Sequence, residues 1–394
     1  MLQVESFRAK CAIPFLLREP IMNRFIRGLL LALPLCLAAG AAHADFNAGR
    51  AAYKAGNFTT AVKEYTAAAE AGEARAQNDL GVLYERGAGV AQDYVKAAQW
   101  YGRAADQGYL QAITNLGYLY ETGHGVTQDY TRAQALYQQA ADKNWAQAQN
   151  NLGGRYEKGR GIPRDYIKAL AWYRKAAAQG LAQGQTNVGY MTETGRGTPR
   201  DDAQALEWYR KAAAQGYAQA ENNIGALHER GRGVAQSSTT AVEWYKKAAA
   251  KNLAQAQTNL GYMYATGRGI QRNDNEALKH YRAAAEQGFA QGQNNFAFML
   301  AAGRGVKQDY RQAKSWYEKA VAQGLAQAML NLGALYEYGR GVPRNQKQAL
   351  AYYQQSAEAG HRPATLRMAQ IYKNGQLGES IDLTRSKLWA DRAL

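Results

Sequence analysis

The chain has 394 residues, a formal net charge of +16 and only two cysteines, Cys11 and Cys36. Both cysteines lie in an N-terminal segment that we expect to be removed, so the mature chain can form no disulfide and offers no thiolate. Packing alone must therefore stabilise the mature protein.

The segment that starts at Met22 has the features of a secretory signal. Arg24 and Arg27 precede an apolar run over residues 29–39, and small residues follow at positions 42 and 44. We therefore expect residues 22–44 to be a signal peptide that is cleaved between Ala44 and Asp45, which makes the mature protein periplasmic or secreted. Residues 1–21 fit no part of this signal and are interpreted as a non-native upstream extension.

The apolar run is too short to hold the mature chain in a membrane. It contains Pro34 and about a dozen residues, whereas a spanning helix needs roughly 20. Removing the segment takes away five Lys/Arg and two Asp/Glu and leaves a net charge of +13. In the cytosol this charge would indicate nucleic acid. An exported chain meets cell-wall polymers, acidic polysaccharides and acidic proteins instead, so we expect no nucleic-acid partner.

A 36-residue period dominates the rest of the chain and predicts a stack of similar units. A shorter related unit fills residues 45–72, and a capping unit fills residues 361–394. Between them lie eight blocks of equal length, at residues 73–108, 109–144, 145–180, 181–216, 217–252, 253–288, 289–324 and 325–360.

Each block has the pattern of two antiparallel helices. In the third block, Ala148, Leu152 and Tyr156 form one buried stripe at helical spacing. Gly159 ends that helix, and Asp165 can cap the second one by accepting backbone hydrogen bonds. The capping position is also Asp at Asp93, Asp129, Asp201 and Asp309. The last position of each block is Gly or Asn, the residues that tolerate a left-handed helix end.

The recurring pattern Leu-Gly-x-x-Tyr-x-x-Gly-x-Gly-(Val/Ile)-x-x-Asp-Tyr-x-x-Ala-x-x-Trp-Tyr-x-x-Ala-Ala-x-x-Gly resembles the Sel1-like repeat of the tetratricopeptide repeat superfamily. The first unit, with Gly56-Asn57-Phe58, looks more like an ordinary tetratricopeptide repeat. The resemblance implies an all-α solenoid, a right-handed superhelix of antiparallel helix pairs. It also implies an adaptor that brings partners together, and many bacterial members of the family are exported.

One tyrosine recurs in every block and could be mistaken for part of a cofactor site or a stacking platform. Paired alanines follow six of the eight rings, and small residues beside large ones are typical of helix packing. We therefore expect the whole column to be core: Tyr101, Tyr137, Tyr173, Tyr209, Tyr245, Tyr281, Tyr317 and Tyr353.

Signals for catalysis are weak. His124, His228, His280 and His361 lie in different repeats without metal-ligand spacing. The Gly-x-Gly loops lack the Lys-Ser/Thr ending of a phosphate loop and the strand of a dinucleotide fingerprint. We predict no enzyme activity, no cofactor and no metal site.

The first helices carry two columns that could bind a partner. An asparagine amide both donates and accepts hydrogen bonds, so a ladder of asparagines could bracket an extended peptide, although it could equally bridge neighbouring repeats. Exposed rings one turn further on indicate a covered surface. The predicted contact residues for a protein or peptide partner are Asn115, Asn151, Asn187, Asn223, Asn259, Asn295, Asn331, Tyr118, Tyr190, Tyr262 and Phe298.

The alternative function is binding of an acidic glycan or another envelope polyanion by arginines in the loops. Four of these arginines follow a glutamate by three residues and are expected to pair with it, as Arg160 with Glu157. Ala265 and Ala301 interrupt this pattern and leave Arg268 and Arg304 without that partner. The predicted polyanion site is Arg268, Arg272, Arg304, Lys307 and Arg311. We favour the non-catalytic exported adaptor over this alternative.

Overall fold

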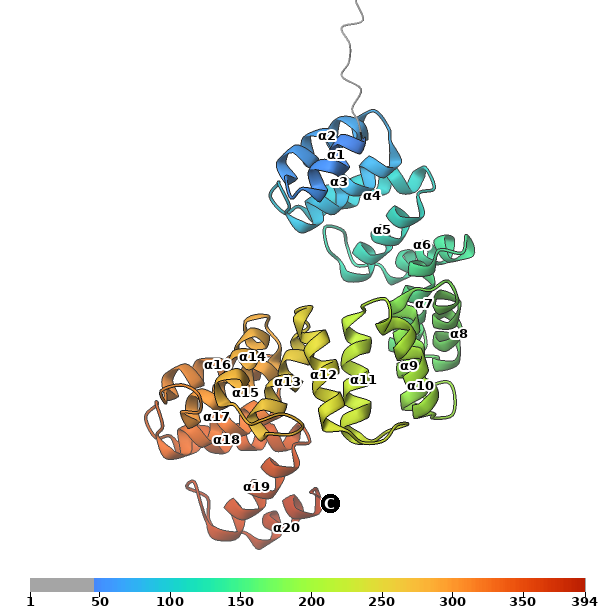
Figure 1. Cartoon of the computed structure of the whole chain (residues 1–394). Helices are drawn as coiled ribbons and strands as arrows, with labels where there is room; N and C mark the ends of the chain where they lie inside the picture. The colour runs from blue at the N-terminus through green and yellow to red at the C-terminus, as the bar shows by residue number, and fades with distance from the viewer. Residues whose placement is uncertain (1–45, 394) are drawn as a thin grey trace, which may run out of the picture. The chain divides into compact units, whose positions relative to one another are not determined.

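The computed structural model describes residues 46–393, which form twenty α-helices and no strand (Figure 1). The predicted signal peptide and upstream extension lie outside the described residues. The helices are α1 (Phe46–Lys54), α2 (Phe58–Glu70), α3 (Ala74–Arg86), α4 (Tyr94–Asp106), α5 (Leu110–Thr122), α6 (Tyr130–Asp142), α7 (Ala146–Lys158), α8 (Tyr166–Ala178), α9 (Ala182–Thr194), α10 (Asp202–Ala213), α11 (Ala218–Arg230), α12 (Ser238–Ala250), α13 (Ala254–Thr266), α14 (Asp274–Glu286), α15 (Ala290–Ala302), α16 (Tyr310–Ala322), α17 (Ala326–Tyr338), α18 (Gln346–Glu358), α19 (Arg362–Asn374) and α20 (Leu383–Asp391).

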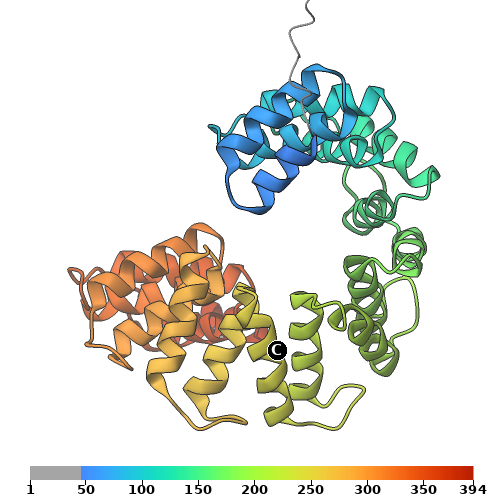
Figure 2. The same ribbon diagram turned by 45° about the horizontal axis from the view of Figure 1, so that its top comes forward.

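Each helix packs against the helices before and after it in the chain (Figures 1 and 2). This arrangement confirms the predicted all-α solenoid. The odd-numbered helices also contact one another between neighbouring repeats, as α7 with α9 and α13 with α15, whereas the even-numbered helices mainly contact the odd ones. We call the solvent-facing side of the odd-numbered helices α3 to α17 the first-helix face.

The helix ends follow the predicted caps. Gly159 ends α7 with a φ of 68°, and the Asp165 side chain accepts a hydrogen bond from the Lys168 backbone amide at 2.9 Å. The other four predicted aspartates cap their helices in the same way. Asn144 and Asn252 adopt φ values of 60° and 62°, which explains why only Gly or Asn occupies the last position of a block.

The tyrosine column is core, as predicted, and every ring in it is at least 96% buried. Most of these rings lie against a glycine of the preceding helix. A Cβ atom on Gly189 would stand 2.7 Å from Cε1 of Tyr209, so a side chain there would push the two helices apart. The glycine thus permits close helix packing, and the ring fills the remaining space.

No helix within residues 46–393 is long and apolar enough to cross a membrane.

Candidate binding surface

The hydroxyls of six core tyrosines bind a carboxylate at the C-terminal end of the preceding helix. The Tyr209 hydroxyl, for example, donates to Glu193 Oε2 at 2.8 Å. Burial raises the pKa of Tyr209, which keeps the hydroxyl protonated and able to donate. The six pairs are Tyr101–Glu85, Tyr137–Glu121, Tyr173–Glu157, Tyr209–Glu193, Tyr245–Glu229 and Tyr353–Glu337.

Four of these glutamates also bind an arginine from the loop of the next repeat, 39 residues further along the chain. These pairs are Arg160–Glu121, Arg196–Glu157, Arg232–Glu193 and Arg268–Glu229. The prediction that Arg160 pairs with Glu157 within its own repeat is therefore wrong. Gly159 lies between them in the left-handed conformation, so the chain leaves the helix before the arginine and directs it toward the preceding repeat.

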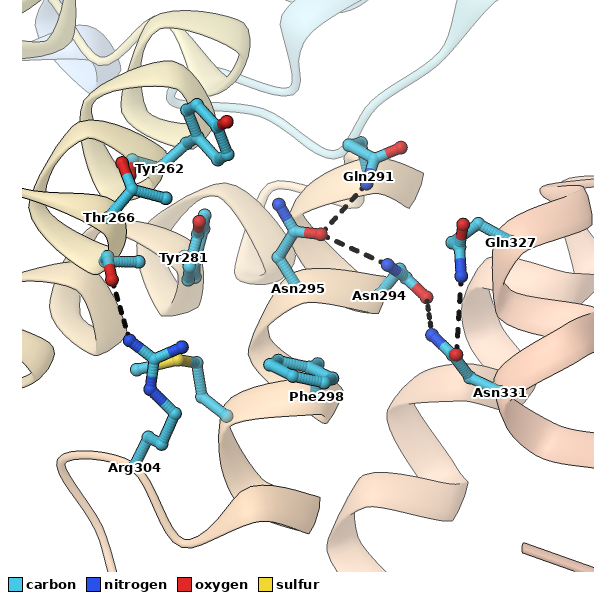
Figure 3. A pocket seen from close by; sticks show the side chains of 12 residues that line it. Tyr262, Thr266, Tyr281, Gln291, Asn294, Asn295, Phe298, Arg304, Gln327 and Asn331 are labelled. Carbon is cyan, nitrogen blue, oxygen red and sulfur yellow. Dashed lines mark hydrogen bonds between the residues drawn. The ribbon is translucent and has the colours of Figure 1, made fainter. Parts of the chain in front are cut away.

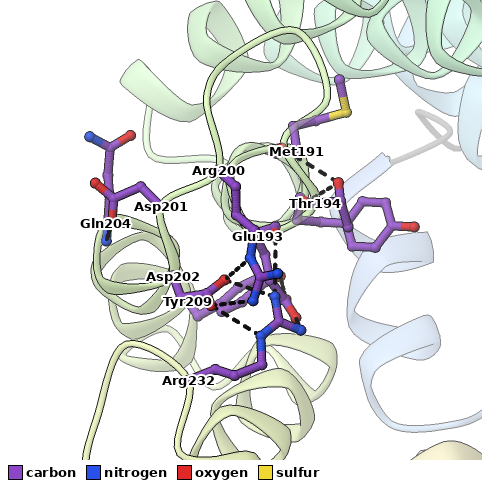
Figure 4. A network of polar contacts seen from close by, with 10 residues as sticks. Met191, Glu193, Thr194, Arg200, Asp201, Asp202, Gln204, Tyr209 and Arg232 are labelled. Atoms are coloured by element: carbon purple, nitrogen blue, oxygen red, sulfur yellow. Dashed lines mark hydrogen bonds and ion pairs between the residues drawn. The ribbon is translucent and has the colours of Figure 1, made fainter.

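Arg232 shows the full network (Figure 4). Its Nη1 atom lies 3.0 Å from Glu193 Oε1, and its Nη2 and Nε atoms bind the Asp202 carboxylate at 2.8 and 3.1 Å. Arg200 binds the same carboxylate at 2.6 Å. Hydrogen bonds from Arg200 and Arg232 lower the pKa of Asp202 to about 2. The positive charges of Arg200 and Arg232 are thus compensated by the negative charges of Asp202 and Glu193.

The arginines of the predicted polyanion site already have carboxylate partners. Arg304 binds both oxygens of Asp274, Arg272 binds the same residue at 3.1 Å, and Arg268 lies 3.7 Å from Glu229. Arg268 and Arg304 lack the glutamate three residues earlier, as expected, but each has a carboxylate partner from another position in the fold, which lowers the support for a free anion site. Lys307 and Arg311 are exposed.

The predicted asparagines are half-buried and form a hydrogen-bonded ladder across the first-helix face. Alternate members donate to a buried asparagine of the preceding repeat, and Asn115 Nδ2 thus lies 3.1 Å from Asn78 Oδ1. The same bond joins Asn187 to Asn150, Asn259 to Asn222, and Asn331 to Asn294. The intervening residues Asn151, Asn223 and Asn295 instead accept a bond from a glutamine one turn earlier.

These contacts support the reading that the asparagines bridge repeats, and they reveal two features that sequence reasoning missed. The first is the glutamine column, in which Gln147 donates to Gln183 and Gln219 to Gln255 in the next repeat. The second is an alternation with a period of two repeats. The residue before the ladder position is Asn at 78, 150, 222 and 294 but Thr at 114, 186 and 258, and the last repeat departs from the alternation with Leu330. In the first of these repeats the ladder position itself is Asp79. A comparison of alternate blocks could have found the alternation.

The four predicted aromatic residues project from the first-helix face. Their exposed fractions are 46% for Tyr118, 37% for Tyr190, 40% for Tyr262 and 49% for Phe298. Arg196 lies over the Tyr190 ring at 5.2 Å, and Arg268 donates to the Tyr262 hydroxyl at 3.3 Å. The loops therefore border the rings with positive charge.

Two cavities on this face are equivalent sites four repeats apart. The downstream pocket, of about 460 Å³, contains Tyr262, Ala265, Tyr281, Phe298 and Arg304 together with ladder amides (Figure 3). The upstream pocket, of about 400 Å³, has Tyr118, Glu121, Tyr137, Gly154 and Arg160 at the corresponding positions. The downstream pocket thus has a phenylalanine, Phe298, where its counterpart has Gly154, and an alanine where its counterpart has a glutamate.

The histidines do not gather into a site. His124 stacks on Tyr94, His280 stacks on Tyr264, and His361 lies 2.8 Å from Gln327. Residues 46–393 contain no group of three or more His, Cys, Asp or Glu side chains placed to hold a metal ion.

Comparison with known proteins assigns the repeats. The model of the Sel1 repeat matches residues 74–109, 110–145, 146–181, 182–217, 218–253, 254–289, 290–325, 326–361 and 362–394. The chain belongs to the Sel1 repeat family. Proteins of this family are generally protein-interaction scaffolds, and their fold is typically non-catalytic.

Two solved structures are similar to this Sel1 repeat protein. A protective antigen present in uropathogenic Escherichia coli strains, which displays an SLR fold, is 34% identical over 88% of this chain and 75% of its own, with a TM-score of 0.55. A Sel1 repeat protein from Oxalobacter formigenes is 33% identical over 62% of this chain and 96% of its own, with a TM-score of 0.57. Comparison with curated proteins gave no match.

The tyrosine hydroxyls predict a difference between two equivalent Sel1 repeats. Tyr209→Phe should leave Oε2 of the partly buried Glu193 without its hydroxyl donor and lower the free energy of unfolding by about 1–3 kcal/mol. Tyr281→Phe is the matched control, since Ala265 stands where the glutamate would be, and it should cost less. Urea denaturation followed by circular dichroism measures both, and equal losses would contradict the proposed role of the tyrosine–glutamate bond.

The Asp202 carboxylate predicts an acid-sensitive contribution to stability. Its pKa falls from an ordinary 3.8 to about 2 on folding, so this contribution is complete above about pH 4 and is lost as the pH falls toward 2. The thermal midpoint of the native protein should therefore drop more steeply between pH 4 and 2 than that of the Asp202→Asn variant. Parallel curves for the two proteins would show that Asp202 does not contribute in this way.

Proposed function

We propose that this protein is a non-catalytic exported adaptor that binds a protein partner, through an extended segment, along its first-helix face. The observation that carries this proposal is the row of exposed rings at Tyr118, Tyr190, Tyr262 and Phe298. Aromatic rings beside a hollow are typical of binding surfaces because they bury a large apolar area at low entropic cost. Export is inferred from the signal-like segment at residues 22–44.

The amide ladder supports the same surface. Asn115 uses one of its two amide hydrogens to bind Asn78, so a second hydrogen and the carbonyl oxygen can still meet a ligand. Because the intrachain bonds fix the orientation of each amide, a peptide backbone would meet groups that are already ordered. The ladder can thus be structural and contribute to binding.

The polyanion alternative has less support. The carboxylates beside Arg268, Arg272 and Arg304 neutralise part of the positive charge that a polyanion would need. Only Lys307 and Arg311 of the predicted site are exposed and have no ion pair among the described residues. We therefore do not favour the loops as the primary binding site.

The aromatic residues provide the test. Replacing Tyr190, Tyr262 and Phe298 with alanine should preserve helicity and weaken partner capture at least about tenfold, since each ring is a potential anchor. The matched control replaces Val95, Ile167 and Leu383, which are 53%, 72% and 66% exposed on even-numbered helices. Quantitative mass spectrometry of proteins cross-linked in an envelope extract compares the two. Equal recovery of partners by both variants would rule out the first-helix face.

A further inference from the structure

The downstream pocket lacks a carboxylate that six other repeats of the solenoid supply. At six repeats a glutamate accepts a hydrogen bond from the core tyrosine. Ala265 takes the place of this glutamate beside Tyr281, but the two donors that would bind it are retained. Tyr281, Arg304 and Ala265 all line the cavity, and Figure 3 shows the first two of these side chains.

The network at Arg232 shows what is missing, because it lies two repeats earlier at equivalent positions. There, Arg232 binds Asp202 and the Glu193 backbone carbonyl, and its Nη1 atom binds the Glu193 carboxylate (Figure 4). Arg304 makes the corresponding bonds to Asp274 and to the Ala265 carbonyl. Among the described residues no carboxylate meets the Nη1 atom of Arg304, since its counterpart has become alanine.

The charges lead to the same conclusion. Arg200 and Arg232 are balanced by Asp202 and Glu193, whereas Arg272 and Arg304 share Asp274 alone. The downstream pocket therefore has one positive charge in excess. The next repeat extends this excess, because Ala301 replaces the glutamate that would face Arg340.

The Tyr281 hydroxyl is also available as a donor. Tyr281 lines the cavity together with the ladder residue Asn295. The Tyr209 hydroxyl donates a hydrogen bond to Glu193, but no carboxylate among the described residues accepts one from Tyr281. Because Tyr281 lines the cavity, a ligand that enters it can provide the acceptor that Glu193 provides to Tyr209.

We propose that the downstream pocket binds an acidic segment of a protein partner, with one Asp or Glu carboxylate accepting hydrogen bonds from Tyr281 and Arg304 in the space left by Ala265. An apolar side chain next to this carboxylate packs between Tyr262 and Phe298, which are exposed on the same cavity. The segment is a peptide rather than a small anion, because the cavity also presents the ladder amides of Asn295 and Asn331 to a backbone. This inference rests on the proposed function and names the chemistry of its partner.

A peptide library provides the probe. Random dodecamers displayed between fixed flanking sequences have no free C-terminus, and selection on the mature protein should enrich Asp or Glu beside an apolar residue. The best binder is then synthesised with an acetylated N-terminus and an amidated C-terminus and measured by fluorescence anisotropy. Changing its acidic residue to the amide should weaken binding about tenfold or more, as expected for a hydrogen bond to a charged group.

A double-mutant cycle assigns the carboxylate to the pocket. Tyr281→Phe should weaken the acidic peptide several-fold but leave the amide peptide unchanged, whereas Tyr209→Phe, the matched control, should change neither. Ala265→Glu should supply the missing carboxylate from the protein itself, raise the thermal midpoint and abolish peptide binding.

The outcomes separate this inference from the proposed function. Peptides that need Tyr262 and Phe298 but show no coupling to Tyr281 would overturn the carboxylate site and leave the adaptor intact. Enrichment of peptides without acidic residues would do the same. Failure of every peptide to bind would count against both.

Discussion

The solenoid depends on the contact between a tyrosine ring and a helical glycine. The glycine lets two helices approach closely, and the ring of Tyr209 or its equivalents fills the space between them. The ring also carries a hydroxyl to the end of the preceding helix, where a glutamate accepts its hydrogen. Because an arginine from the next repeat binds that glutamate, one side chain ties together packing within a repeat and polar contact between repeats. A stack whose units contact only their neighbours requires such links at each interface.

The polar links are not uniform along the chain. Asparagine pairs bridge alternate interfaces of the first helices, and threonines at the intervening positions bond within their own helix, as Thr114 does with Leu110. The same alternation places Tyr118, Tyr190 and Tyr262 two repeats apart. The structural ladder and the exposed rings therefore share one two-repeat unit, which makes the departures at Ala265 and Ala301 conspicuous.

The features that could be predicted from the sequence are those that depend on single residues and their immediate neighbours in the chain. The 36-residue period, the left-handed helix ends at Asn144 and Asn252 and the aspartate caps follow from steric and hydrogen-bonding preferences of single residues. The partners of Arg160 and Arg304 could not be found in this way, since they come from a neighbouring repeat and depend on the direction in which the loop leaves its helix.

Arg155 shows the same limit in the core. It occupies a position where other repeats have Leu or Met, yet it is 99% buried. Its guanidinium donates to Gln134 and to the Tyr130 carbonyl of the preceding helix. Burial lowers the pKa of Arg155. From the sequence alone, an arginine at this position would be predicted to be exposed. Its polar partners lie on the neighbouring helix α6, so only the folded structure reveals them.

The alternating amide bridge has a consequence for the length of such a chain. Insertion or loss of one 36-residue block would place two helices with Asn at the Asn78-type position next to each other, or two helices with Thr there. The asparagine bridges would then no longer alternate with unbridged interfaces at that point. Duplication of a 72-residue pair keeps every Asn78-type residue opposite an Asn115-type residue. Growth in pairs is thus physically favoured, and a new pair would add a further exposed tyrosine to the face with each step.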